Sequence, residues 1–472
     1  MGLSELLNGK QIVAVVCNQW GDTGKGKFSD YFASHWADVT ARGTGGNNAG
    51  HTVVVNGKEK IFHLLPTGIT QDSEGKTTIL GNGMVIDLVV LCRELDELKK
   101  EGKTHKHLMI SKDAHVIMPY HIDHDKRKNQ SQKQGGIGST GRGIGPCYAD
   151  KIARRGITIA DVVDKEKLKK KIEKASQFYS NQKIDAQEII NELEPFIEKI
   201  KPFVKDTVKE MHTFVKEGKK ILIEGAQGLL LSIEHGTYPY VTSSDCSLNG
   251  TASGVGIPAS IIDLPIGIVK FPFMTRVGAG PFTTEFGGRT SEDYCAEEIT
   301  KVDELQKHGI PFSNSNGHIS YNYQDPKIIE MMNSADEFTK GIGFRLTAGE
   351  YGATTGRPRR IGWTDAVAAK YAVNINGPLI ILTKADAIAG SKEFKICYGY
   401  SNSEYFSKDE EQLKKSKPQY KTYKGYGDIS KIKKYEDLPE SLKEAIEDFE
   451  SFTGGKVVAV SVGAEREQTI IK

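Results

Sequence analysis

The chain has 472 residues, of which 38% are hydrophobic and 26% are charged, so it can bury one large core or two fused cores, and its composition excludes a disordered or fibrous protein. A formal net charge of +2 gives no long-range field that favours nucleic acid or a membrane surface. The cysteines form no CxxC pair, no cleavable signal is recognised, and no apolar stretch approaches the roughly eighteen residues that span a bilayer. We therefore expect a globular, enzyme-sized cytoplasmic protein without nucleic acid or membrane partners.

The first predicted element is a buried strand over residues 11–17, followed by the loop Gly21-Asp-Thr-Gly-Lys-Gly-Lys27 and a helix. A strand that leads into such a loop aims backbone N–H groups and a lysine at phosphate oxygens. The loop departs from the standard phosphate loop because Gly26 follows Lys25, where a serine or threonine would bind magnesium. It also places the Asp22 carboxylate where it would repel phosphate, unless a metal bridges the two or the carboxylate transfers protons. The loop therefore predicts chemistry as well as binding.

Two further glycine-rich loops follow in the first third of the chain. Residues 45–52 let the backbone approach a ligand closely, and His51 within them is either a structural histidine or a general acid or oxyanion donor. Residues 135–146 are either a flexible connector or a loop that contacts phosphate through side chains such as Thr140 and Arg142. We favour phosphate binding for the second loop.

Short aliphatic runs along the chain are typical of buried parallel strands that end at ligand loops. They cover residues 78–80, 221–223, 267–270, 378–383 and 457–461. Lys- and Glu-rich sequence with apolar residues at helical spacing predicts a helical subdomain over about 161–220, and a polar stretch predicts a surface insertion over about 288–346. We expect an α/β fold with one domain over residues 1–472, built on a large, mostly parallel central sheet with a phosphate-loop-like nucleotide site.

Three later segments carry further candidate chemistry. The loop 224–228 and the hydroxyl-rich segment 236–244 suit a nucleobase oxygen and a phosphate, although such clusters are commonly turns. Residues 352–360 hold three arginines in a Gly/Thr loop, which is either a solvated turn or a clamp for carboxylates or a phosphoryl group. After the strand at 378–383, the Asp386 carboxylate can accept the N1–H and the exocyclic amine of guanine, whereas adenine presents an acceptor there, so this residue selects GTP over ATP.

Long motifs in one order, along nearly the whole chain, resemble those of the adenylosuccinate synthetase family. One such motif alone is weak, but six or seven in register are specific. They are Gln19-Trp-Gly-Asp-Thr-Gly-Lys-Gly-Lys27, Asn47-Asn-Ala-Gly-His-Thr52, Thr140-Gly-Arg-Gly-Ile-Gly-Pro146, Glu224-Gly-Ala-Gln-Gly228, Tyr238-Pro-Tyr-Val-Thr-Ser-Ser244, Arg276-Val-Gly-Ala-Gly-Pro281 and Gly352-Ala-Thr-Thr-Gly-Arg357. The resemblance implies the reaction GTP + IMP + L-aspartate → adenylosuccinate + GDP + phosphate, with magnesium, on the route to AMP.

The resemblance also implies a role for each catalytic residue. Asp22 removes the N1 proton of IMP and coordinates Mg²⁺, and His51 acts as an acid toward the γ-phosphate of GTP. The aspartate amine then displaces phosphate from C6 of 6-phosphoryl-IMP. Lys25 and Gln227 complete the catalytic set, and the Gly50 carbonyl is the second magnesium ligand of the protein. The GTP-binding residues implied are Gly21, Gly24, Lys25, Gly26, Lys27, Arg359, Lys384, Asp386, Ser461, Val462 and Gly463.

A second set of residues is implied to bind IMP and L-aspartate. Arg357, with Thr354 and Thr355, holds the aspartate carboxylates, and Arg154 reaches the IMP of the neighbouring subunit. The active unit implied is therefore a homodimer. The complete substrate-binding set is Asn48, Thr140, Arg154, Gln227, Thr242, Val277, Thr354, Thr355 and Arg357.

The chain departs from the family pattern at several positions. The family usually has glutamate where Thr23 stands, and we expect this change to lower turnover because a carboxylate beside the phosphates is lost. Ser232 and Glu234 replace the usual aspartates, and the stretch at 288–346 is longer than in typical bacterial members. We expect these other differences to alter loops or regulation and to leave the reaction class unchanged.

Two alternatives to the ligase stay open from the sequence. The first is a GTP- and IMP-binding regulatory protein with reduced or lost turnover, which Thr23 makes conceivable, although the intact Asp22 and His51 argue against it. The second is a related ligase that uses another amine donor. The Arg357 clamp favours a dicarboxylate such as aspartate over other amines.

Overall fold

The computed structural model describes residues 3–55, 58–131, 140–179, 182–297, 299–315, 318–352, 356–465 and 467–472. The chain forms two compact units. The first unit comprises Met1–Leu6, Cys17–Gly24 and Ile266–Lys472, and the second comprises Leu7–Val16 and Lys25–Pro265. The boundary therefore falls within the glycine and lysine loop, between Gly24 and Lys25.

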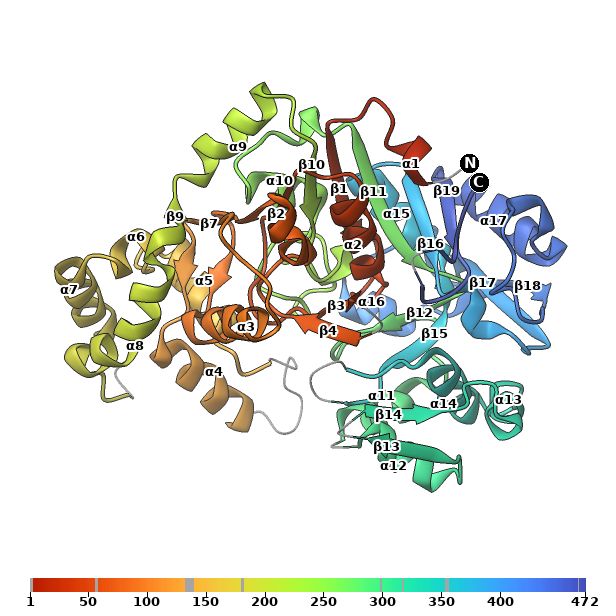
Figure 1. Cartoon of the computed structure of the whole chain (residues 1–472). Helices are drawn as coiled ribbons and strands as arrows, with labels where there is room; N and C mark the ends of the chain where they lie inside the picture. Colours follow the sequence, from red (N-terminus) through yellow and green to blue (C-terminus); the bar gives the residue numbers. More distant parts are fainter. Residues whose placement is uncertain are drawn as a thin grey trace. The chain divides into compact units, whose positions relative to one another are not determined.

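The second unit is built on six strands of the ten-stranded main sheet (Figure 1). In spatial order they are β1 (Ile12–Cys17), β10 (Ile221–Glu224), β2 (Val39–Arg42), β5 (Thr77–Leu80), β7 (Leu108–Ser111) and β9 (Val204–Lys205). Each neighbouring pair in this series is parallel. Every residue of β1, β10 and β2 is buried, which suits aliphatic strands of a parallel sheet with both faces covered.

Helices and short strand pairs surround this part of the sheet. The helices are α2 (Lys25–His35), α3 (Leu88–Lys100), α4 (Pro119–Ser131), α5 (Ile144–Ile152), α6 (Ile159–Val162), α7 (Lys165–Ser176), α8 (Ala186–Ile200), α9 (Thr207–Lys216) and α10 (Leu248–Ser253). The short pairs are β3 (His51–Val55) with β4 (Lys58–Phe62), and β6 (Val85–Ile86) with β8 (His115–Val116). Helices α3 and α8 share one apolar core that includes Leu95 and Leu193.

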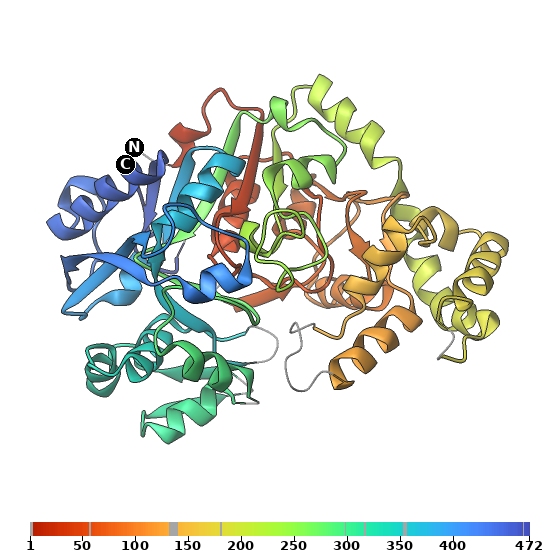
Figure 2. The ribbon, with the colours of Figure 1, turned by 180° about the vertical axis from the view of Figure 1, so that it is seen from behind.

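The segment predicted as a helical subdomain contains α6 to α9, of which α6, α7 and α8 lie together in both views of the ribbon (Figure 1, Figure 2). The predicted spacing is visible in α8, where Ile189, Ile190, Leu193 and Ile197 are buried while the intervening acidic residues are not. The subdomain boundary at about 161–220 stays a prediction, as does the treatment of residues 1–472 as one domain.

The first unit contributes the remaining four strands of the main sheet. They are β11 (Leu264–Lys270), β16 (Leu379–Thr383), β19 (Lys456–Ser461) and β20 (Thr469–Ile471), and β20 is antiparallel to β19 whereas the other pairs are parallel. A four-stranded sheet lies in the same unit, with the order β12 (Phe273–Arg276), β15 (Arg360–Asp365), β17 (Glu393–Tyr400) and β18 (Pro418–Lys424).

The helices of the first unit follow or precede these strands. They are α1 (Leu3–Leu6), α11 (Gly288–Ala296), α12 (Lys301–Lys307), α13 (Pro326–Met332), α14 (Glu337–Ala348), α15 (Ala366–Asn376), α16 (Glu410–Lys415) and α17 (Glu440–Thr453). The predicted insertion at 288–346 contains α11 to α13, most of α14 and the hairpin β13 (Phe312–Ser315) with β14 (His318–Tyr321). The insertion boundary stays a prediction.

The predicted fold class is confirmed, because the chain has a large, mostly parallel ten-stranded sheet with many helices. The predicted strands correspond to β1, β5, β10, β11, β16 and β19. Along the parts of the chain that the structure describes, no helix is long and apolar enough to cross a bilayer.

Candidate active site

Asp22 lies in the loop after β1 and is paired with Arg359, and both residues belong to the first unit. The Asp22 backbone is left-handed, with φ of +48°, and the flanking Gly21 and Gly24 have φ of +84° and +79°. The Arg359 Nε donates a hydrogen bond of 2.6 Å to Asp22 Oδ2. The Asp22 side chain keeps 38% of its surface exposed, so a partly solvated carboxylate lies beside a fixed cation.

Three parallel strands of the same unit end at one edge of the sheet, where further predicted residues follow them. Lys270 of β11 lies opposite Thr383 of β16, and Leu382 lies opposite Val460 of β19. Ligand loops of parallel sheets gather at such an edge. The predicted guanine residues Lys384 and Asp386 follow the end of β16, and the segment 461–463 begins at the last residue of β19. The structure thus brings the predicted guanine residues to one edge.

Lys384 is held tightly at this edge. Its backbone is left-handed, with φ of +62°, and its Nζ donates a hydrogen bond of 2.9 Å to the Ala348 carbonyl. Asp386 lies in the short 3₁₀ helix at Ala385–Ile388. At the end of β19, Ser461 Oγ donates to the Gly463 carbonyl at 3.0 Å. Val462, which stands between Ser461 and Gly463 in the chain, is fully buried.

Thr23, the departure from the family pattern, lies in the same loop as Asp22. Its side chain is almost fully buried, and its hydroxyl has no hydrogen-bond partner among the described residues. The Thr383 hydroxyl donates to the Thr23 carbonyl at 2.8 Å. The backbone of the loop is therefore fixed to β16 by a contact that does not depend on the side chain at position 23.

The second unit brings four predicted residues into one chain of hydrogen bonds. Lys25 opens α2, and its Nζ donates to the Gln227 carbonyl at 3.2 Å. The Gln227 Nε2 donates to Asn48 Oδ1 at 3.1 Å, and Asn48 Nδ2 donates to Thr242 Oγ1 at 3.2 Å. Gln227 has a left-handed backbone, with φ of +50°, and its buried Oε1 has no partner among the described residues. An amide oxygen without a partner is an acceptor that a ligand can use.

The loop that carries Asn48 is held by a residue that the sequence analysis missed. The Arg42 guanidinium at the end of β2 is fully buried and donates to the carbonyls of Thr44, Gly46, His63 and Leu64 at 2.7–3.3 Å. Burial lowers the pKa of Arg42, and the Glu224 and Glu94 carboxylates oppose that shift. The only sequence signal was an arginine at the end of the short stretch Val39-Thr-Ala-Arg42.

Arg154 lies at an exposed turn after α5. Its φ is +61°, and the neighbouring Ile152 is 78% exposed. The turn is fixed by Asp150, which accepts a hydrogen bond from Arg155 Nε at 2.8 Å and is paired with the buried His121 at 3.1 Å. Burial alone would raise the pKa of Asp150, but its hydrogen bonds with His121 and Arg155 outweigh burial, and the pKa is lowered.

The remaining predicted residues are placed less fully. His51 begins β3, and its side chain lies outside the described residues, as do Thr354 and Thr355 entirely. Thr140, Arg154 and Arg357 are exposed, and among the described residues the hydrogen bonds of Gln227 and Asn48 run to one another and to Thr242. The rest lie in described backbone: Gly26 and Lys27 in the first turn of α2, Gly50 before β3, and Val277, whose N–H donates to the Trp20 carbonyl at 3.2 Å.

Backbone strain singles out the predicted site. Among the described residues, four non-glycine residues have positive φ, and all four are predicted site residues: Asp22, Arg154, Gln227 and Lys384. Such a conformation costs about 1–3 kcal/mol for a residue with a side chain, and it is concentrated at functional sites.

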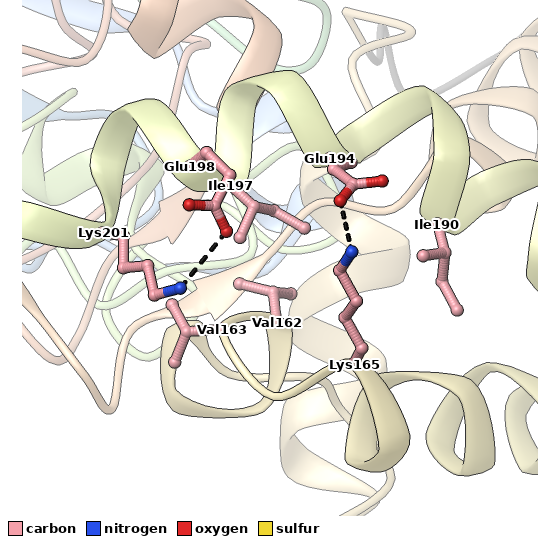
Figure 3. Close-up of a pocket in the computed structure, with 8 residues that line it drawn as sticks. All are labelled: Val162, Val163, Lys165, Ile190, Glu194, Ile197, Glu198 and Lys201. Carbon is pink, nitrogen blue, oxygen red and sulfur yellow. Dashed lines mark hydrogen bonds and ion pairs between the residues drawn. The ribbon is translucent and has the colours of Figure 1, made fainter.

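A cavity of about 190 Å³ beside α6, α7 and α8 has no predicted site residue in its lining (Figure 3). It is lined by valine and isoleucine side chains and by the pairs Lys165–Glu194 and Lys201–Glu198.

Comparisons with known proteins identify the family. A model of the adenylosuccinate synthetase family matches residues 14–470. The chain belongs to the adenylosuccinate synthetase family. It is 40% identical to the adenylosuccinate synthetase of Fusobacterium nucleatum, over 97% of this chain and 98% of the relative. It is 41% identical to that of Borrelia recurrentis, over 98% of each.

A solved structure of fully ligated adenylosuccinate synthetase from Plasmodium falciparum has a TM-score of 0.80 and 32% identity, covering 98% of this chain and 100% of that chain. As a member of this family, the chain is a GTP-dependent ligase that joins IMP and L-aspartate in AMP biosynthesis. The comparisons give no support to the regulatory alternative or to another amine donor.

Proposed function

We propose that the chain forms adenylosuccinate in two chemical steps, with Asp22 as the base. Asp22 takes the N1 proton of IMP, and the 6-oxygen attacks the γ-phosphorus of GTP, which breaks the bond to GDP. The amine of L-aspartate then adds at C6 and loses a proton, and the C6–O bond breaks, so that the 6-oxygen leaves with the phosphoryl group as phosphate. The observation that carries this proposal is the strained, partly exposed Asp22 carboxylate with the Arg359 guanidinium at 2.6 Å.

The other roles follow from the chemistry of the groups. Arg359 supplies positive charge for the phosphates of GTP, Asp386 reads the guanine edge, and Lys384 lies beside the guanine. Gln227, Asn48 and Thr242 supply donors and acceptors for IMP, and Lys25, which donates to the Gln227 carbonyl, contacts the phosphates of GTP. His51 donates a proton or hydrogen bond to the transferring phosphoryl group, and Arg357 with Thr354 and Thr355 holds the carboxylates of L-aspartate.

The donor set fits magnesium. Mg²⁺ binds proteins through one or two oxygen ligands and otherwise keeps water and substrate phosphates. The partly exposed Asp22 carboxylate is a ligand of that kind, and the second ligand in this proposal is the carbonyl of Gly50, an exposed residue. The described residues contain no cluster of three His, Cys, Asp or Glu that would form a cage for another metal. When bound, the ion neutralises charge on the phosphates of GTP.

The active form proposed is a homodimer in which Arg154 binds the IMP of the partner. An exposed, strained arginine beside the exposed Ile152 supports this role. Mixing Arg154→Leu subunits with Asp22→Asn subunits tests it, because a mixed dimer can regenerate one intact site. Activity that returns on mixing supports the dimer, whereas two inactive variants that stay inactive when mixed contradict it.

Phosphate release from GTP tests the reaction. We expect release that requires both IMP and L-aspartate, with adenylosuccinate as the product. Absence of release under every condition would contradict the ligase, and release with a different amine would favour another donor.

A further inference from the structure

The strongest unassigned feature near Asp22 is a buried ion pair in the first unit. Lys270, the last residue of β11, is fully buried, and its Nζ lies 2.6 Å from Glu350 Oε2. The same Nζ donates to Thr275 Oγ1 at 3.0 Å and lies 5.6 Å from the centroid of the Phe273 ring. The Lys270 side chain has no exposed surface to offer a ligand. Any effect of Lys270 on the reaction therefore passes through its neighbours.

Glu350 links Lys270 to the arginine that contacts Asp22. The Arg359 N–H donates to the Glu350 carbonyl at 3.0 Å, and the Glu350 N–H donates to the Arg345 carbonyl at 3.0 Å. Arg345 Nε in turn donates to the Arg359 carbonyl at 2.8 Å. The Arg359 backbone is therefore held at its N–H by the Glu350 carbonyl and at its carbonyl by the Arg345 side chain. The Glu350 side chain is in turn paired with Lys270.

The backbone of Lys270 is also joined to the loop that carries Asp22. The Gln19 side chain accepts from the Lys270 N–H at 2.9 Å and donates to the Lys270 carbonyl at 3.0 Å. Lys270 thus closes a ring of contacts that passes through Glu350, Arg359, Asp22 and Gln19, and every member belongs to the first unit. The ring therefore holds the Asp22 carboxylate from the Gln19 side and the Arg359 guanidinium from the Glu350 side.

Electrostatics agrees with the geometry. Burial lowers the pKa of Lys270, and the Glu350 and Asp22 carboxylates oppose that shift while the Lys384 ammonium adds to it. The buried ammonium therefore interacts with the charge of Asp22, the base in the proposed function.

We propose that Lys270 is a positioning residue for the ligase, whose buried ion pair with Glu350 holds the Arg359 guanidinium against the Asp22 carboxylate. The inference rests on the proposed function of Asp22. It adds a residue that touches no substrate, and it predicts that breaking the pair misplaces Arg359 without disturbing the neutral contacts in the second unit.

The first test compares Lys270→Met with the double variant Lys270→Met/Glu350→Met. The single variant leaves a buried carboxylate unpaired, so its Tm falls, and a misplaced Arg359 lowers kcat by roughly 100-fold and raises KM for GTP while KM for IMP stays unchanged. The double variant removes both charges and recovers Tm, but kcat and KM for GTP stay impaired. Recovery of all three values in the double variant would show that the pair is only structural and would overturn the proposal.

The second test places Arg359→Ala on the same background. If Lys270 acts through Arg359, the triple variant Lys270→Met/Glu350→Met/Arg359→Ala loses no more kcat than Arg359→Ala alone, because the two changes remove the same interaction. Additive losses would overturn the proposal. Lys421→Met, which removes a lysine paired with Asp448 in the same unit, is the matched control and should keep normal kcat and KM values.

Asp22→Asn separates failure of this inference from failure of the proposed function. Turnover that survives Asp22→Asn contradicts the assignment of Asp22 as the base, whatever Lys270 does. An inactive Asp22→Asn together with a Lys270→Met variant of normal kcat and normal KM for GTP leaves the proposed function intact and overturns the inference.

Discussion

The contacts around Asp22 in the first unit differ in kind from the contacts around Asn48 in the second unit. In the first unit the contacts around Asp22 are between full charges, as in the Asp22–Arg359 and Lys270–Glu350 pairs. In the second unit Gln227, Asn48 and Thr242 are joined by neutral amide and hydroxyl groups. Charges change the energy of a transition state in which charge moves, whereas neutral hydrogen bonds mainly recognise a bound ligand. The comparison predicts that removing the charged contact at Asp22 lowers kcat, whereas removing the neutral contacts at Asn48 lowers the affinity for IMP.

The largest effect is expected for Asp22→Asn. An amide cannot take the N1 proton, so kcat should fall by about 1000-fold, within the usual range for a general base. Equilibrium binding of IMP should persist because the neutral contacts in the second unit are unchanged. Phosphate release and IMP titration measure the two quantities, and loss of IMP binding with unchanged kcat would reverse the comparison.

Asp365, a carboxylate of the first unit outside the predicted site, tests whether loss of any buried charge lowers turnover or only loss of a charge at the site. Asp365 is buried, accepts a hydrogen bond from the Tyr400 hydroxyl at 2.6 Å, and burial raises its pKa to about 6. Its ordinary value is 3.8, so the folded chain binds a proton more readily than the unfolded chain, and stability from this group is lost as pH rises from about 4 to about 6. The loss is about 3 kcal/mol.

Asp365→Asn should remove this pH dependence and leave turnover unchanged. Relative to the parent chain, the free energy of unfolding of the variant should therefore increase between pH 4 and pH 7. Denaturant unfolding at several pH values measures it. A variant that becomes relatively less stable as pH rises would contradict the expected sign.

Asn48→Ala is expected to act on binding. It removes the acceptor of Gln227 and the donor to Thr242, so KM for IMP should rise by about tenfold, the worth of one or two neutral hydrogen bonds. The value of kcat should change little, because the lost contacts bind the ground state and the transition state alike. A fall in kcat with unchanged KM would place Asn48 in the chemistry instead.

The smallest effect is expected for Thr23→Glu. The restored carboxylate should raise kcat a few-fold, because we expect threonine at this position to lower turnover. The site is almost fully buried, so the same change should also lower Tm. Steady-state phosphate release checks the rate, and turnover in the parent chain that equals or exceeds that of the variant would refute the prediction.

The sequence predicted the main strands because buried parallel strands are continuous aliphatic runs, as in β1 and β16. It predicted Asp22 and Gln227 because long motifs carry them in a fixed order. It could not predict Arg42 or Lys270, since their roles depend on carbonyls and a carboxylate that lie far away in the chain. A lysine at the end of a buried aliphatic strand was the only local signal for Lys270.

The left-handed backbone at Asp22, Arg154, Gln227 and Lys384 has a consequence for the evolution of this enzyme. Glycine adopts that conformation without strain, so glycine at any of these positions should make the fold easier to keep while removing a side chain that the proposed mechanism uses. Selection for heat resistance alone would therefore drive these positions toward inactive protein. Only selection for AMP synthesis in the same experiment would retain the four strained side chains.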